Sequence, residues 1–338
     1  MEIRARYAIA RQPILPAILK AAVAIAAILF LCPAASAQNW PSRPVTIVSP
    51  FLAGSTPDAV ARIIAERLQR KLGQTFVVEN RTGASGNTGT AVVAKAAPDG
   101  HTLGVSIVGP LVINALLFPQ MPYETSRDIA PIMILASQPS VLTLNPTVKA
   151  DDVSALIAIM KKDADKIAYG SIGRGSLSHL AMESFAAKAG VRLLHVPYAG
   201  SPAVVTALLR GDVQVAVLPA GAVVPHAAEG KLKMLAVTSA RRSPLLPLLP
   251  TLAESGIANV EADAWVGLIA PIGVPADTLV RIRENVAEIM REPELIEKLK
   301  LQFMTPVAGT ADEFRAVLRE EYARWSPVIA AGAIKADQ

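Results

Sequence analysis

The segment 45–58, with the sequence VTIVSPFLAGSTPD, constrains the fold more than any other part of this chain. An apolar strand runs into a loop of small residues, and the loop opens directly onto a helix. We expect Thr56 to cap that helix and Pro57 to take its first position, where no backbone donor is needed. Asp58 adds negative charge to the first turn, which suits the helix dipole. The pattern predicts a strand–loop–helix unit of an α/β fold.

The loop of this unit also has the composition of an anion site. Gly54 and Ser55 have little side chain that would cover the helix N-terminus. Free backbone N–H groups at the positive end of a helix dipole bind anions. An ordinary strand–helix connection has the same residues, and for one segment alone it is the more frequent case.

The first 37 residues resemble a secretory signal peptide in composition. An apolar core over 21–31 is followed by Ala35-Ser36-Ala37, a small-residue motif that predicts cleavage before Gln38. The core is too short to span a bilayer about 30 Å thick. No later segment is a continuous transmembrane run, so we expect an exported, soluble chain in the periplasm. The basic residues of the leader are Arg4, Arg6, Arg11 and Lys20.

Removing the leader excludes several kinds of chemistry. Cys32 is the one cysteine of the chain, so the mature protein has no disulfide, no thiol nucleophile and no cysteine metal ligand. The formal charge of +5 falls to +2 once the four basic residues and the one acidic residue of the leader are gone. That charge gives no reason to expect nucleic-acid binding.

Strand and helix patterns alternate along the rest of the chain, which predicts an α/β protein with mostly parallel sheets. A capping box at 310–313 predicts one last long helix. The expected strands cover 45–48, 76–79, 102–107, 138–145, 167–171, 191–196, 213–218, 232–238 and 265–270. The expected helices cover 59–72, a short stretch ending near Lys95, one beginning at Asp151 or Asp152, 180–189, 201–210, 222–229, 276–290 and 293–300.

Two further loops join a strand to a helix in the same way as the first one. They cover 170–179, where Ser176 or Ser178 is expected to be the helix cap, and 197–202. If the three loops meet at the carboxyl ends of their strands, they form one anion-binding cleft. Each loop taken alone is also compatible with a purely structural role.

Catalytic motifs are weak in this sequence. The nucleophile elbow, the phosphate-binding P-loop and the HExxH metal motif are absent, and the four histidines have no metal-ligand spacing. Ser176 and His179 are three residues apart on one helix face and could pair as nucleophile and base. Because a serine at a helix start more often caps the helix, a serine hydrolase or lyase is the alternative in a different functional class.

The order and spacing of several motifs resemble the Bug family, the periplasmic substrate-binding receptors of tripartite tricarboxylate transporters. The resemblance covers nearly the whole mature chain. The motifs are WPSRP at 40–44, PF at 50–51 with GSTPD at 54–58, VENR at 78–81 before the Gly-rich loop 83–89, APDG at 97–100, LNP at 144–146, YGS at 169–171 with GRGSLSH at 173–179, HVPY at 195–198 with GS at 200–201, GKL at 230–232, AVTS at 236–239 and WVGL at 265–268.

This resemblance implies a two-lobed, Venus-flytrap binding protein whose chain crosses between lobes near Val141 and Asp263. Domain I would comprise 38–141 and 263–338, and domain II would comprise 142–262. A small organic carboxylate would bind between the lobes and pass to membrane permease subunits, without a cofactor or metal. We expect a monomer. A sensor receptor for a two-component kinase is the alternative within the same class.

The resemblance also assigns ligand contacts to the loops of both lobes. Arg174 is unusual in a loop built mostly of small residues. Its side chain either leaves the cleft for solvent, as most arginines do, or selects a second anionic group of the ligand, which is our hypothesis. Many relatives have Gly-Gly where this chain has Gly54-Ser55. Many relatives also have a Phe-Asp or Asp-Asn pair after the strand that ends here at 217–220. The absence of that acidic residue from this chain favours an apolar or purely anionic ligand. The candidate contacts are Phe51, Gly54, Ser55, Thr56, Asp58, Ser106, Val108, Gly109, Ser171, Gly173, Arg174, Gly175, Ser176, His179 and Gly200.

Overall fold

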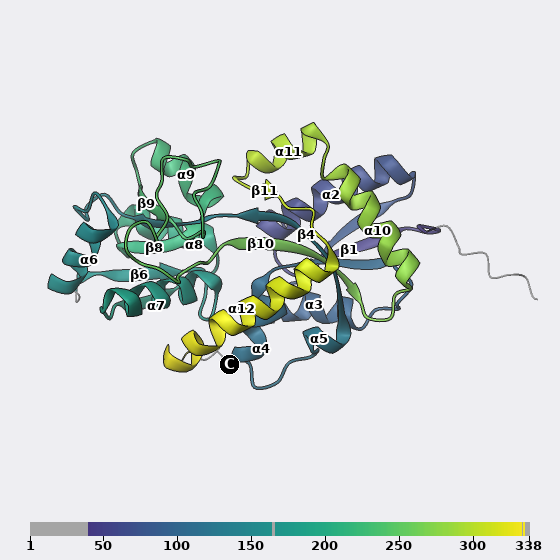
Figure 1. Ribbon diagram of the computed structural model, residues 1–338, viewed down its shortest axis with the longest axis horizontal. Coiled ribbons are helices and arrows are strands. Elements are labelled where there is room, and N and C mark those ends of the chain that lie inside the picture. Colours follow the sequence, from purple (N-terminus) through teal and green to yellow (C-terminus); the bar gives the residue numbers. More distant parts are fainter. Residues whose placement is uncertain (1–39, 164–165, 333, 335–338) are drawn as a thin grey trace, which may run out of the picture. The chain divides into compact units, whose positions relative to one another are not determined.

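Two β-sheets with flanking helices make up the fold (Figure 1). The computed structural model describes residues 40–163, 166–332 and 334, so the predicted signal peptide and its cleavage site lie outside the described residues. From Arg43 onward the chain forms one compact unit that contains both sheets.

The first sheet has the strand order β11-β4-β10-β3-β1-β2. Strand β1 pairs in parallel with β2 and β3, whereas β10 pairs antiparallel with both β3 and β4, and β11 pairs antiparallel with β4. The two long strands β4 and β10 run side by side (Figure 1). The strands are β1 (Val45–Ser49), β2 (Phe76–Asn80), β3 (Thr102–Ser106), β4 (Ile129–Gln138), β10 (Ala264–Pro271) and β11 (Thr305–Pro306).

The second sheet has the strand order β7-β6-β8-β5-β9. Its β6 pairs in parallel with β7 and β8, and β5 pairs antiparallel with β8 and β9. Among the described residues four of the nine strand pairings are parallel, so the expectation of mostly parallel sheets was wrong. The strands are β5 (Ser140–Leu144), β6 (Ala168–Ser171), β7 (Leu194–Pro197), β8 (Val215–Pro219) and β9 (Lys233–Val237).

One expected strand was misplaced where the chain passes from the first sheet to the second. The sequence predicted a single strand over 138–145, but β4 ends at Gln138 and β5 begins at Ser140 in the other sheet. Pro139 lies between them and cannot donate a hydrogen bond to either ladder. The chain re-enters the first sheet at Ala264. The predicted domain boundaries at 141 and 263 lie close to these two points and stay predictions.

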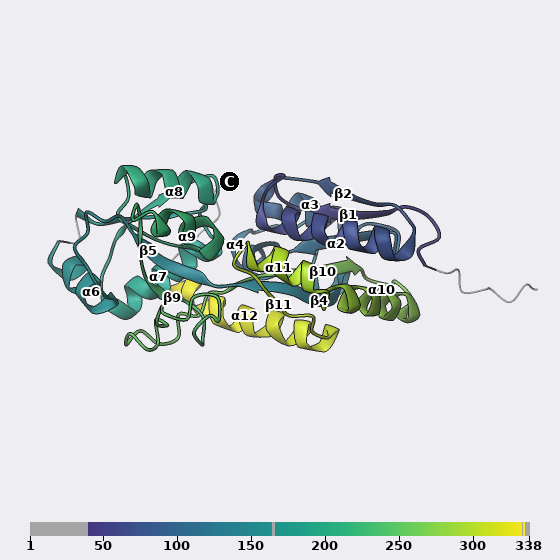
Figure 2. The ribbon, with the colours of Figure 1, turned by 90° about the horizontal axis from the view of Figure 1, so that it is seen from above.

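The helices belong largely to one sheet or the other. In Figure 2 the purple strands β1 and β2 lie beside α2, and α3 packs on β1, β3 and β10. Helices α7 and α8 pack on β6 and β8, and α9 packs on β5 and β8. The last helix, α12, packs on both β4 and α7. The bounds are α2 (Thr56–Leu72), α3 (Asn87–Ala94), α4 (Asn114–Leu117), α5 (Thr125–Asp128), α6 (Val153–Lys162), α7 (Leu177–Ala189), α8 (Ser201–Arg210), α9 (Ala220–Ala228), α10 (Ala276–Ile289), α11 (Pro293–Lys300) and α12 (Ala311–Gly332).

The helix ends follow local sequence signals closely. The N-cap of α2 is Ser55 and not Thr56, so that prediction was wrong by one residue. Ser176 caps α7 by accepting a hydrogen bond from the His179 amide. The predicted capping box of α12 is confirmed, because Thr310 Oγ1 accepts from the Glu313 amide at 3.2 Å and the Glu313 carboxylate accepts from the Thr310 amide at 2.6 Å.

Candidate functional site

The loop between β1 and α2 is organised around a buried carboxylate. Asp58 is 2% exposed and accepts hydrogen bonds from the Gly54 amide at 2.8 Å, from Arg62 Nε at 3.0 Å and from Asn80 Nδ2 at 2.8 Å. Burial opposes ionisation of Asp58, but these hydrogen bonds and the Arg62 charge outweigh it and lower the pKa. Asp58 therefore holds the loop together from inside.

This arrangement changes which groups of the first loop can face a ligand. The Gly54 amide is occupied by Asp58, and the Ser55 amide donates to the Leu52 carbonyl at 3.1 Å. The buried Ser55 hydroxyl, by contrast, has no hydrogen-bond partner among the described residues. Because a buried polar group without a partner is costly, Ser55 Oγ is the group of this loop that would gain most from a new hydrogen bond if the loop opened. Contact of Thr56 with a ligand stays a prediction.

The Phe51 side chain connects the first loop to the next part of the site. A Cβ atom on Gly86 would lie 2.9 Å from Phe51 Cζ and 2.6 Å from Pro110 Cγ, so the three residues are in close contact. Pro110 belongs to a single π-helical turn, Gly109–Ile113, which the sequence analysis did not predict. Such turns frequently occur at functional sites.

Buried amides and a phenol fix this turn. Asn87 Oδ1 accepts from Asn114 Nδ2 at 2.6 Å, and the Tyr123 hydroxyl lies 2.5 Å from the Pro110 carbonyl oxygen and 3.2 Å from Asn87 Oδ1. Burial raises the pKa of Tyr123 far above its usual value, so the phenol stays a donor.

The predicted contacts at 106–109 differ in accessibility. Ser106 is fully buried and its hydroxyl lies 3.3 Å from Thr90 Oγ1, and Val108 is 3% exposed. Gly109, which starts the π-helical turn, is partly exposed. Of this group Gly109 is thus the residue most accessible to a ligand.

The loop between β6 and α7 is held by two histidines. Ser171 Oγ lies 2.7 Å from His195 Nε2, and it also accepts from the Gly173 amide at 3.3 Å. The Gly175 amide donates to His179 Nδ1 at 2.9 Å. Two imidazoles therefore anchor this loop, one at Ser171 and one at Gly175.

The two imidazoles belong to a stack of three rings. The His179 and His195 ring centroids are 3.8 Å apart with 9° between the planes, and the Tyr169 ring lies 4.8 Å from that of His195. Tyr169 and His195 are direct partners in the parallel pairing of β6 with β7, which explains why the rings meet. The Tyr169 hydroxyl donates to the Glu183 carboxylate.

Burial and nearby charges keep the two outer members of this stack, Tyr169 and His179, neutral. Burial, together with the nearby His195 and Arg174, lowers the pKa of His179 to about 3. Burial and the Glu183 carboxylate raise the pKa of Tyr169 well above its usual value. His179 is among the predicted contact residues, whereas His195 and Tyr169 were noted only as members of the HVPY and YGS motifs. Pairing of the strands at 169 and 195 is the signal that could have identified both.

The loop that contains Gly200 lies against the histidine-held loop. The Tyr198 amide donates to the Ser171 carbonyl at 2.9 Å, and a Cβ atom on Gly173 would lie 3.8 Å from the Tyr198 carbonyl oxygen. Gly200 is the N-cap of α8 and has no side chain to close that helix end. Two of the three predicted loops therefore meet at the carboxyl ends of β6 and β7.

Gly175 connects this second group of loops with the π-helical region. A Cβ atom on Gly175 would lie 2.2 Å from Leu117 Cδ1 at the end of α4, and Gly175 has a positive φ of 73°. Only glycine allows both this approach and this backbone conformation without strain. Arg174, next to it, is exposed, and its charge reaches both Tyr169 and His179.

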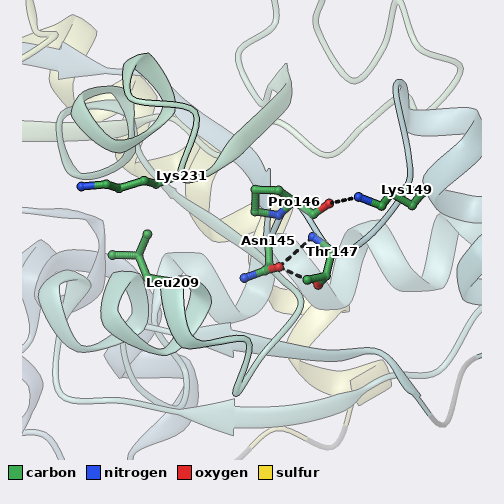
Figure 3. A pocket seen from close by; sticks show the side chains of 6 residues that line it. All are labelled: Asn145, Pro146, Thr147, Lys149, Leu209 and Lys231. Atoms are coloured by element: carbon green, nitrogen blue, oxygen red, sulfur yellow. Dashed lines mark hydrogen bonds between the residues drawn. The ribbon is translucent and has the colours of Figure 1, made fainter.

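A separate hollow lies at the opposite end of the second sheet. Its volume is about 490 Å³, and Figure 3 shows its lining, in which Asn145 Oδ1 accepts from the Thr147 amide at 2.8 Å and Lys149 donates to the Pro146 carbonyl. Leu144 pairs with Val215, at the start of β8, so this hollow is remote from the loops that follow β6 and β8. None of the predicted contact residues lines it.

Two further findings concern what the described residues lack. No group of three or more His, Cys, Asp or Glu side chains in 40–163, 166–332 and 334 is arranged to hold a metal ion. Within the same residues no helix combines the length and the apolar character that crossing a membrane requires.

Comparison with known proteins assigns the chain to a family. The model of the tripartite tricarboxylate transporter family receptor matches residues 60–334. The chain belongs to this receptor family. It is 36% identical to the protein BugT of Bordetella pertussis over 295 residues, which is 87% of this chain and 90% of BugT. The expected membership of the Bug family and the α/β periplasmic-binding-protein fold are confirmed.

Solved structures agree with this assignment. The R. palustris protein Rpa4515, solved with adipate, is 33% identical with a TM-score of 0.81 over 88% of this chain and 100% of that one. MatC from Rhodopseudomonas palustris, solved with bound malate, is 29% identical with a TM-score of 0.76 over 86% of this chain and 100% of its own. The periplasmic binding protein BugD is 30% identical with a TM-score of 0.77 over 88% of this chain and 100% of BugD.

Proposed function

We propose that this protein is a periplasmic receptor that binds a small organic dicarboxylate and delivers it unchanged to permease subunits in the membrane. The chain reaches the periplasm through a signal peptide cleaved before Gln38 and acts as a monomer. The observation that carries the proposal is the loop 171–176, which histidines hold in a fixed shape at the carboxyl ends of two parallel strands. Ligands of open α/β sheets bind at such strand ends.

Dicarboxylates are the ligand class that the relatives favour. Two structural relatives were solved with adipate and with malate, and both ligands carry two carboxylates. The accessible Gly109 supplies a neutral contact on one side, and Arg174 supplies a positive charge on the other. A guanidinium pairs with a carboxylate through two parallel hydrogen bonds, so Arg174 suits the second carboxylate of the ligand.

Hydrolysis by Ser176 and His179 is disfavoured by the hydrogen bonds of both residues. Ser176 Oγ accepts from the His179 amide, and His179 Nδ1 accepts from the Gly175 amide at 2.9 Å, so the predicted pair does not form a nucleophile and its base. The serine that does contact an imidazole, Ser171, has no solvent exposure. We therefore propose a binding function without chemistry.

Native mass spectrometry of the mature protein, purified without refolding, tests this function. We expect an adduct with the mass of a dicarboxylate, and the ligand recovered after denaturation has the same mass. Calorimetry with adipate and malate, and with butyrate as the monocarboxylate control, then ranks the affinities. Binding of none of these acids, or recovery of a hydrolysed product, would contradict the proposal. Deleting the receptor gene and measuring growth on the identified acid distinguishes uptake from sensing. If the receptor serves uptake, the deletion strain no longer takes up the acid. If it serves sensing through a kinase, the strain loses only the induction of genes by the acid.

A further inference from the structure

The Ser171 hydroxyl has three polar neighbours and a single proton. The Gly173 amide donates to Ser171 Oγ at 3.3 Å, the Gly173 carbonyl lies 3.0 Å from it, and His195 Nε2 lies 2.7 Å from it. A hydroxyl donates one hydrogen bond and accepts two. All three contacts are satisfied together only when the hydroxyl donates to the carbonyl and His195 Nε2 carries a proton.

The neighbouring imidazole has a fixed role of its own. Because the Gly175 amide donates to His179 Nδ1, the proton of neutral His179 sits on Nε2, which faces the Glu183 carboxylate at 3.8 Å. His179 is 3% exposed. It therefore forms a rigid, neutral surface on which the His195 ring stacks at 3.8 Å.

We propose that His195 is a positioning residue of the ligand site, whose Nε2–H group orients Ser171 and thereby fixes the Gly173 peptide. This inference rests on the proposed function, since the loop 171–176 is the part of the site that it shapes. The stack between Tyr169 and His179 sets the plane of the His195 ring, and the hydrogen bond to Ser171 transmits that orientation to the loop. Preorganised contacts of this kind raise affinity by reducing the ordering cost of binding.

Two variants separate the hydrogen bond from the ring stack. His195→Gln can place an amide donor near the position of Nε2 but loses the ring, whereas His195→Phe keeps a stacked ring and loses the donor. We expect His195→Phe to weaken adipate or malate binding by about tenfold and His195→Gln to stay within about threefold of the wild type. His226→Phe and His226→Gln in α9 are the matched controls, and we expect wild-type affinity for both.

Measurements without ligand decide the inference even if the proposed function fails. Nitrogen-15 NMR of the imidazoles should show His195 protonated at Nε2, and hydrogen exchange of the Gly173 amide should be about tenfold faster in His195→Phe than in the wild type. A His195 protonated only at Nδ1, or unchanged exchange in a folded His195→Phe, would overturn the role of His195. Failure of the wild type to bind any dicarboxylate would instead overturn the proposed function.

Discussion

Asp263 offers a strong test of how its surroundings change the pKa of a carboxyl group in this fold. It lies directly before β10, where the chain returns to the first sheet, and burial raises its pKa from 3.8 to about 7. The charge of Glu321 acts in the same direction, and Arg324 opposes it. One carboxylate oxygen of Asp263 has no hydrogen-bond partner among the described residues. We expect Asp263→Asn to stabilise the protein above neutral pH.

The direction and size of this stability difference between Asp263→Asn and the wild type follow from proton linkage. Between pH 4 and 7 the folded state binds a proton at Asp263 that the unfolded state has released, so the free energy of unfolding falls as the pH rises. A pKa that moves from 3.8 to about 7 corresponds to at most about 4 kcal/mol at pH 8. Allowing for relaxation of the charged form, we expect Asp263→Asn to be more stable than wild type by about 2 kcal/mol at pH 8 and about equal at pH 4.

Urea unfolding at pH 4, 6 and 8 measures this difference directly. His179 contributes in the opposite direction, because its lowered pKa of about 3 makes the free energy of unfolding fall as the pH drops below 6.5. Subtracting the free energy of unfolding of the variant from that of the wild type at each pH removes this contribution, since both proteins contain His179. Asp277→Asn, on the exposed first turn of α10, is the control for the substitution of Asp by Asn itself. A destabilisation by Asp263→Asn that is the same at pH 4 and pH 8 would refute the reasoning.

Three further predictions concern the loops. Gly175→Ala should lower the free energy of unfolding by about 1–2 kcal/mol more than Gly190→Ala, because Gly190 has a similar φ of 68° but open space around it. Adding Leu117→Ala to Gly175→Ala should remove that difference in thermal melts. Arg174→Ala should reduce the ratio of dicarboxylate to monocarboxylate affinity by about ten- to a hundredfold, and an unchanged ratio in calorimetry would show that Arg174 does not contact the ligand. Asp58→Asn should cost about 1–3 kcal/mol at pH 7, and because the pKa of Asp58 is lowered, urea unfolding should show this deficit shrinking as the pH falls below 3.8.

Local signals in the sequence predicted local structure well. The capping box of α12 and the serine cap of α7 depend only on neighbouring residues. Sheet direction depends on partners far along the chain, and its prediction failed. Strand β4 was missed because a buried apolar run with Pro131 inside it has no alternating pattern.

The candidate site shows the same contrast between features that a short stretch of sequence predicts and contacts that it does not. The loops themselves were predictable, because small residues between a strand and a helix are visible in one stretch of sequence. Their internal hydrogen bonds were not, since the amide of Gly54 is taken by a carboxylate four residues later, and the stack of His179 on His195 requires β6 and β7 to be neighbours. Ligand contacts of the individual residues stay predictions.

The position of β10 has a consequence for the order in which the chain can fold. Strand β10 lies between β3 and β4 and is the strand that joins them in the first sheet. A growing chain that ends at residue 263 already contains all five strands of the second sheet, but its first sheet is still divided into two pieces. The half of the fold that begins nearest the N-terminus is therefore completed last. A nascent chain thus keeps its first sheet open until β10, which ends at Pro271 of the 338 residues, has been synthesised.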